Sequence, residues 1–164
     1  MNKRLLRIDG SFELSEYQTA DSDNAIGQAD NVFLPLQTFL THRNELTERS
    51  NIGIWLDANE EIESLGKIPD SVSVIALNFP AFNDGRSFSS AVMLRRHLRY
   101  EGDIRAIGDV RIDQLEQMCR CGFTSFELAP GQNETLAVEK LKVFTNTYQS
   151  AVNQSGLLHN RAHS

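Results

Sequence analysis

The hydrophobic positions of this chain become regular from residue 51 onward, where short apolar runs alternate with helical patterns. A short apolar run bounded by turn residues predicts a buried strand, and apolar positions three or four apart predict a helix. The predicted strands are NIGIWLD (51–57), SVSVIALNF (71–79), GDIRAIGD (102–109) and FTSFEL (123–128). The predicted helices are ANEEIESLG (58–66), residues 87–99, RIDQLEQMCRCG (111–122) and NETLAVEKLKVFTNTYQS (133–150).

This alternation predicts the fold class. At least four successive strand–helix units favour an α/β protein with a parallel sheet, because right-handed crossovers are nearly the only way to connect parallel strands. The near-continuous apolar run at 71–79 is typical of such a sheet. The spacing of the units does not distinguish an open, doubly wound sheet from a partial TIM-barrel-like one.

An N-terminal extension of short strands and a helix precedes these units. KRLLRI (3–8) predicts a strand, and a second short strand is expected near Phe12. From Asp9 to Asp30 the chain has six acidic residues and no basic one, which indicates a solvated loop. Pro35 suits the first turn of a helix with an apolar face. We therefore expect one α/β domain at 1–150, with the extension at 1–31, the core at 32–150 and a flexible tail at 151–164.

Composition narrows the function classes. The 164 residues carry a net charge of −6 and have no lysine- or arginine-rich tail, which argues against nucleic-acid and membrane-surface binding. The apolar runs are shorter than the roughly 18 residues of a membrane span, and no signal peptide is readable. Two cysteines fit a reducing compartment. The expected localisation is cytoplasmic.

The first candidate site follows the strand at 71–79. Ligands of parallel α/β sheets bind beyond the carboxyl ends of the strands. Asp84-Gly85-Arg86-Ser87 precedes a predicted helix, whose free N–H groups could bind an oxyanion together with Arg86. The alternative, which the motif alone favours, is a turn: Asp84 forms an Asx-turn, Gly85 adopts a positive φ, and Ser87 caps the helix.

A second candidate lies one strand later, at Asp109 and Arg111. Arg111 could reach a pocket shared with Arg86, and either aspartate could act as a general base. The alternative is that Asp109 caps the next helix and Arg111 is solvated.

The remaining motifs exclude several sites. Cys119 and Cys121 are two apart, so on a helix they point in different directions and do not favour a disulfide. Cys119 falls on the apolar face, and Cys121 is the more exposed thiol. The histidines share no metal-ligand spacing, so no metal site is expected. No phosphate-loop, dinucleotide, zinc-protease or hydrolase motif is present, so no cofactor site is evident.

Arginine is concentrated in one segment. Residues 86–120 contain seven arginines, no lysine and five acidic residues, which makes this segment +2 in a chain of −6. A solvated helix face is one explanation. Pairing with carboxylate or phosphate, or a protein interface, accounts better for the exclusive use of arginine.

The segment ALNFPAFNDGRSFSSAVMLRRHLRYEGDIRAIGDVRIDQLEQMCRCGFTSFEL resembles the signature region of an uncharacterised bacterial family. The family pattern is F-P-x-F-x-D-G-R, a leucine–arginine helix, R-A-x-G-D-V, D-Q-L, and R-R-C-G-F-D-x-F-E, and the match spans roughly residues 72–128. Cys121 is the family-type cysteine, whereas Cys119 replaces an arginine and Thr124 an acidic residue. The genes of this family commonly lie beside that for the sulfite reductase haemoprotein, and its members are often labelled oxidoreductases of sulfite reduction.

The resemblance implies an accessory protein of assimilatory sulfite reduction that binds the sulfite reductase haemoprotein or its electron donor. The alternative is an enzyme or oxidoreductase component that binds a small oxyanion such as sulfite or sulfate, and a homodimer is compatible with either. Neither an activity nor a cofactor follows from the family label. The catalytic candidates are Asp84, Asp109 and Cys121. The candidates for binding an anion or a partner are Arg86, Ser87, Arg95, Arg111 and Arg120.

Overall fold

The computed structural model describes residues 3–20, 30–81 and 83–144. The strands are β1 (Arg4–Arg7), β2 (Phe12–Leu14), β3 (Gln18–Thr19), β4 (Val32–Pro35), β5 (Ile52–Leu56), β6 (Val72–Phe79), β7 (Asp103–Gly108) and β8 (Ser125–Phe126). The helices are α1 (Leu36–Thr41), α2 (Arg43–Leu46), α3 (Arg86–Arg96) and α4 (Leu115–Cys121), with 3-10 turns η2 (Ile62–Leu65) and η3 (Ile112–Gln114). Residues 134–144 are also helical.

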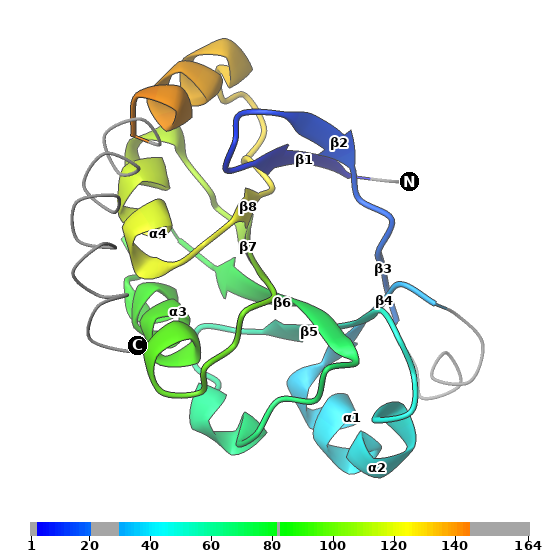
Figure 1. The fold of residues 1–164 in the computed structure, drawn as a ribbon. Coiled ribbons are helices and arrows are strands. Elements are labelled where there is room, and N and C mark those ends of the chain that lie inside the picture. The colour runs from blue at the N-terminus through cyan, green and yellow to red at the C-terminus, as the bar shows by residue number, and fades with distance from the viewer. Residues whose placement is uncertain (1–2, 21–29, 82, 145–164) are drawn as a thin grey trace, which may run out of the picture.

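All eight strands form one sheet in the order β2-β1-β8-β7-β6-β5-β4-β3. Neighbouring strands from β3 to β8 are parallel, whereas β1 is antiparallel to both β8 and β2. The sheet curls into a half-barrel, with the helices on its outer side (Figure 1). The α/β class and the mostly parallel sheet are therefore confirmed, and of the two sheet shapes that the spacing allowed, the structure has the curved one.

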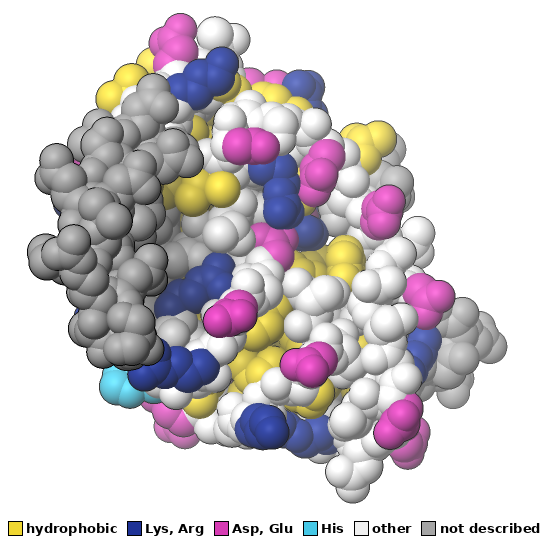
Figure 2. All heavy atoms as spheres, viewed as in Figure 1, with side chains coloured by type: hydrophobic (Ala, Val, Ile, Leu, Met, Phe, Trp, Pro, Cys, Tyr) yellow, Lys and Arg dark blue, Asp and Glu magenta, His cyan; other side chains and the backbone are white. Residues whose placement is uncertain are grey.

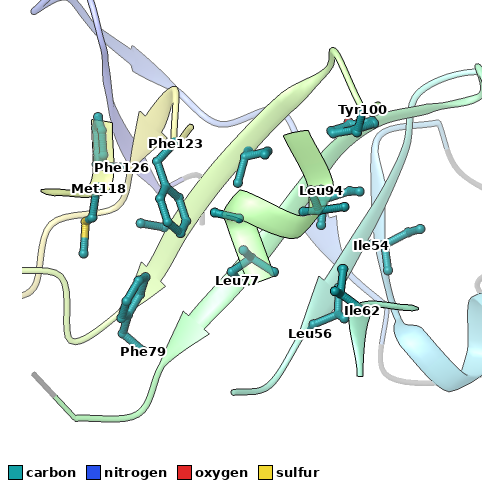
Figure 3. Packing of buried hydrophobic residues seen from close by; sticks show 14 of the residues in the cluster. Ile54, Leu56, Ile62, Leu77, Phe79, Leu94, Tyr100, Met118, Phe123 and Phe126 are labelled. Carbon is teal, nitrogen blue, oxygen red and sulfur yellow. The ribbon is translucent and has the colours of Figure 1, made fainter. Parts of the chain in front are cut away.

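The main hydrophobic core lies between the outer face of the sheet and the helices. Alternate residues of the strands point to this side, including Ile54 and Leu56 of β5 and Leu77 of β6 (Figure 3). Phe79 packs against Phe88 of α3 and Phe123, with ring centroids 5.0 and 5.6 Å apart. Burial of this face by successive helices is what the near-continuous apolar strands require.

The inner face of the half-barrel carries a second, smaller cluster of Phe33, Val74 and Ala76, with Trp55 and Ile107 packed against it. A Cβ on Gly53 would lie 2.6 Å from the Phe33 ring, so only glycine fits there. The β5–β6 register shifts at the same place, between Ile52 and Gly53.

The N-terminal segment connects the two edges of the sheet. Its strands β2 and β3 are the two edge strands, and residues 15–17 between them cross the inner face. Ser15 accepts a hydrogen bond of 2.9 Å from Arg105 on β7. Tyr17 forms a hydrogen bond with Ser73 of β6, and its ring lies 5.0 Å from that of Phe33 on β4. The expected strands near 3–8 and Phe12 are confirmed, and both belong to the main sheet.

Several helix predictions need correction. Residues 58–66 contain only the single turn η2, which ends at Gly66 with φ of 56°. The helix after Pro35 is divided into α1 and α2 at His42. The last helix buries Ala137 and Leu141 as expected. The predicted tail at 151–164, part of the acidic loop and the end of the last helix lie outside the described residues.

Candidate functional site

The carboxyl ends of β5, β6, β7 and β8 lie at one edge of the half-barrel, because these strands are parallel neighbours. The polar residues that follow or close these strands are Asp57, Asn78, Asp109 and Glu127. Both candidate loops begin at this edge.

The Asp84–Arg86 loop is held together by its own charges. Arg86 Nε and Nη2 donate to the two Asp84 carboxylate oxygens at 3.0 and 2.6 Å, and the Arg86 backbone N–H donates to Oδ1 at 3.1 Å. These hydrogen bonds, side chain first, lower the pKa of Asp84 to about 2. The predicted Asx-turn is confirmed. The Arg86 side chain stays 58% exposed, but its charge is already paired within the loop.

The other two residues of this loop differ from their predicted roles. Gly85 has φ of −92° and is itself the residue that precedes α3, so the expected positive φ is wrong. Ser87 lies inside the helix, is buried, and donates its hydroxyl hydrogen to the Asn78 carbonyl at 2.7 Å. Ser87 therefore ties the start of α3 to the end of β6 and does not cap the helix.

The Asp109–Arg111 loop repeats the same arrangement. Arg111 Nε and Nη2 donate to the two oxygens of Asp109 at 3.1 and 3.2 Å. The turn η3 begins at Ile112, and Arg111, not Asp109, precedes it, so the predicted cap is wrong. Each arginine thus pairs with the aspartate two residues before it. Neither pair lines any of the three cavities described below.

The signature glycine between these loops is explained by close packing. Gly108 has φ of +90°, and a Cβ there would collide with Asn78 Oδ1 and the Phe79 carbonyl oxygen. The next residue, Asp109, donates its N–H to the same Phe79 carbonyl at 2.8 Å. On its other side, the Asn78 amide donates to Asp57 at 2.9 Å. The lack of a side chain at Gly108 therefore allows the ends of β6 and β7 to lie in contact.

Arg95, a predicted binding residue, is engaged by the protein's own backbone. Its guanidinium donates to the carbonyls of Gly122, Tyr100 and Gly102 at 2.7–3.1 Å. Gly122 ends α4 in the left-handed conformation, with φ of 114°, as predicted. A Cβ on Gly122 would lie 2.6 Å from Arg95 Cγ. These contacts make Arg95 the link between α3 and the end of α4.

Two further signature arginines have internal partners. Arg120, a predicted binding residue, pairs with Glu116 one turn earlier at 2.7 Å and is exposed. Arg105 is 3% exposed, and its guanidinium contacts Asp103, Ser15 and Ser125. The sequence predicts a strand at 102–109, but not that Arg105 on this strand is covered by the segment that contains Ser15.

The remaining two arginines of the segment lie at the end of α3. Arg96, His97 and Arg99 are exposed, and Arg99 has φ of 56° where the chain turns away from the helix. Within the part of the chain that the structure describes, Arg96 and Arg99 form no ion pair. We call these three residues the α3-end cluster.

The thiol of Cys121 lies close enough to this cluster to be influenced by Arg96. Burial raises the pKa of Cys121, and the charge of Arg96 opposes that shift. Burial raises the pKa of Cys119 to about 12. A raised pKa leaves little thiolate at neutral pH, so neither thiol is activated as a nucleophile.

Three cavities open on the inner face and at its edge. A cavity of 330 Å³ lies beside Arg7, Asp103 and Arg105. A second, of 250 Å³, has Phe33 and Trp55 among its apolar lining residues and Lys3 and Glu127 among its polar ones. A third, of 420 Å³, also includes Lys3 and Glu127 in its lining. Figure 2 shows hydrophobic side chains in the middle of this face, surrounded by acidic and basic ones.

The sequence predicts that Glu127 lies near the end of a strand. It does not predict a contact with Lys3, because the two residues are 124 positions apart. Their side chains form an ion pair of 3.6 Å. Trp55 was assigned only to a buried strand. Its indole N–H is buried and has no hydrogen-bond partner among the described residues.

Among residues 3–20, 30–81 and 83–144, no three His, Cys, Asp or Glu side chains are grouped as a metal site would need. In the same residues no helix has the length and apolar character to cross a membrane.

Comparison with known proteins identifies the family of this chain. No curated protein matches the chain. The model of a family described as "bacterial protein of unknown function (DUF934)" matches residues 53–158, which is well over half of the sequence. This range includes both Asp–Arg loops, Arg95, Gly108 and the α3-end cluster. The chain therefore belongs to the DUF934 family of bacterial proteins of unknown function.

Proposed function

We propose that this protein is an accessory protein of assimilatory sulfite reduction that acts by binding a partner protein. The partner would be the sulfite reductase haemoprotein or its electron donor. The pathway rests on the resemblance of residues 72–128 to the family encoded beside the reductase gene. The proposed contact surface is the α3-end cluster of Arg96, His97 and Arg99.

The single observation that carries this surface is the distribution of arginine partners. Five of the seven arginines in residues 86–120 bond to residues nearby in the structure: Arg86, Arg95, Arg105, Arg111 and Arg120. Arg96 and Arg99 remain exposed at one helix end, in a chain whose net charge is −6. Arginine is enriched at protein interfaces, and exposed like charges steer an oppositely charged partner. The expected partner surface is acidic.

Charge reversal tests this surface. We expect the double variant Arg96→Glu/Arg99→Glu to weaken binding to the purified reductase haemoprotein, measured by calorimetry at low and physiological salt. The matched control is Lys140→Glu/Lys142→Glu, which makes the same charge change on the exposed side of the last helix. A tenfold loss, about 1.4 kcal/mol, in the first variant alone would support the proposal. Absence of a complex at low salt with the haemoprotein and with its electron donor, or an equal loss in both variants, would contradict it.

A second candidate function is binding of a small oxyanion by an enzyme or oxidoreductase component. The observation that favours it is the exposed Arg86 guanidinium at the start of α3, where the positive end of the helix dipole lies. The paired Asp84 carboxylate opposes it, because an anion would have to displace or approach that negative charge. Calorimetric titration with sulfite and sulfate tests oxyanion binding at this site, because Arg86→Ala should abolish any heat of binding that the wild type shows. Equal heats for wild type and variant would exclude this site.

A further inference from the structure

The 250 Å³ cavity on the inner face has the features of a small-molecule site. It lies toward the carboxyl ends of the strands and is lined by Phe33 of β4, Trp55 of β5, and Ala76 and Asn78 of β6. Its volume is just below the roughly 300–1,000 Å³ of drug-sized sites, so its ligand would be small. Its position is independent of the α3-end cluster, none of whose residues lines it.

The charges of this cavity come from one weakly associated pair. Lys3 Nζ and Glu127 Oε2 are 3.6 Å apart, and the Lys3 side chain is 73% exposed whereas that of Glu127 is only 15% exposed. Among the described residues, the Glu127 carboxylate accepts no hydrogen bond, although its backbone N–H donates to Ala106. The Glu127 oxygens are not among the buried polar atoms that lack a partner, so they keep contact with solvent and are open to a ligand. A ligand ammonium would donate hydrogen bonds that Lys3, at 3.6 Å, does not.

The net charge of Lys3 and Glu127 limits which charges the ligand can carry. Lys3 and Glu127 together are neutral, so a purely anionic ligand that takes Lys3 would leave the less exposed Glu127 without its counter-charge, and a purely cationic ligand would leave Lys3 without a partner in the cavity. A zwitterion avoids this, because its ammonium pairs with Glu127 and its carboxylate with Lys3. The aromatic and aliphatic side chains of Phe33, Trp55 and Ile107 provide an apolar wall for a hydrocarbon side chain.

We propose that this inner-face cavity binds a free amino acid with an apolar side chain. Glu127 binds the ammonium group and Lys3 binds the carboxylate, so the ligand replaces the ion pair between them. The ion pair is shared with the 420 Å³ cavity, and its opening lets the ligand enter from that side.

The chain's only tryptophan makes the proposal directly testable, because Trp55 lines the cavity. We expect L-leucine, L-methionine or L-phenylalanine to change the emission of Trp55 saturably. For the amino acid that binds, the amide, which lacks the negative charge, and the des-amino acid, which lacks the positive charge, should bind at least about tenfold more weakly. For leucine these are L-leucinamide and 4-methylpentanoate. Calorimetry on the same solutions registers binding that leaves the emission unchanged.

Variants of Glu127 and Lys3 test which charged group of the ligand each residue binds. Glu127→Gln and Lys3→Met should each weaken amino-acid binding at least about tenfold. Glu134→Gln, which removes a carboxylate from the adjacent cavity only, should leave it unchanged. Absence of binding by all three amino acids at millimolar concentration would overturn the proposal. Equal affinity for the zwitterion and its singly charged analogues, or insensitivity to both variants, would overturn it as well. Arg96→Glu/Arg99→Glu should bind the amino acid normally, so this test is separate from that of the partner surface.

Discussion

At the scale of single residues, the two Asp-x-Arg loops behave as self-contained units. Arg86 pairs with Asp84, and Arg111 with Asp109, each across one intervening residue. Such short separations need little ordering of the chain, so these pairs form locally. The signature aspartates and arginines therefore stabilise the loops. Arg86 and Arg111 could form the shared polar pocket expected from the sequence only if their ion pairs with the two aspartates opened.

Gly108 is constrained both by its positive φ and by backbone atoms close to it. Gly108→Ala should destabilise the protein by about 2 kcal/mol or more, because a side chain at positive φ is strained and its Cβ would meet backbone oxygen of Phe79. Urea unfolding followed by tryptophan emission measures this. The control is Gly85→Ala, where φ is −92° and the Cβ has open space, so no loss is expected. Equal stability of the two variants would show that Gly108 is not required by packing.

At the scale of elements, α3 and α4 are joined by Arg95. Because α4 has only seven residues, its end depends on contacts from outside the helix. Arg95 supplies them by donating to the Gly122 carbonyl, while it also bonds to the turn that leads into β7. This arrangement explains why the signature pairs an arginine of one helix with a Cys-Gly end of the next.

Removal of this link should cost more than removal of the neighbouring charge. We expect Arg95→Met to lower the free energy of unfolding by about 2–3 kcal/mol, since a charged donor to several carbonyls is lost. Arg96→Met, one residue later and exposed, should change it by less than about 0.5 kcal/mol. The measurement is urea unfolding of both variants. A reversed order would assign the stabilising role to Arg96.

At the scale of the whole molecule, the buried Arg105 connects β7, in the centre of the sheet, to the segment that crosses its inner face. It contacts Ser15 in the segment between the edge strands and Ser125 of β8. Asp103 accepts hydrogen bonds from Arg105, Arg7, Thr124 and Ser125 on the same face. A half-barrel exposes its inner face, and this network keeps the crossing residues 15–17 on it.

Removal of the carboxylate should leave Arg105 unpaired. We expect Asp103→Ala to lower the free energy of unfolding by about 3–5 kcal/mol, because a buried charge loses its partner. The double variant Asp103→Ala/Arg105→Met should cost less than the sum of the single variants, by about 0.5–3 kcal/mol. Additive costs would contradict this coupling. Glu116→Ala, which breaks the exposed pair with Arg120, should cost less than about 1 kcal/mol.

Hydrophobic periodicity predicted four of the parallel strands, whereas the parallel edge strand β3 lies within the segment that was expected to be a solvated loop. The positions of β5, β6, β7 and β8 agree with the predicted runs, because buried strands need apolar residues on consecutive positions. The helix expected at 58–66 was wrong, since η2 is a single turn. Its two apolar residues, Ile62 and Leu65, are buried as the pattern requires, but Gly66 at φ of 56° ends the turn after them.

The sequence by itself determined the α/β class, the strand positions and the Asp–Arg loops, because each depends on residues close together in the chain. It also carried the signature that identifies the family. Only the tertiary structure decided the curvature of the sheet, the burial of Arg105, and the meeting of Lys3 with Glu127. These depend on how the N-terminal segment, antiparallel to β8, returns across the inner face. Contacts between residues about a hundred positions apart leave no local pattern, so they had to be seen in the folded chain.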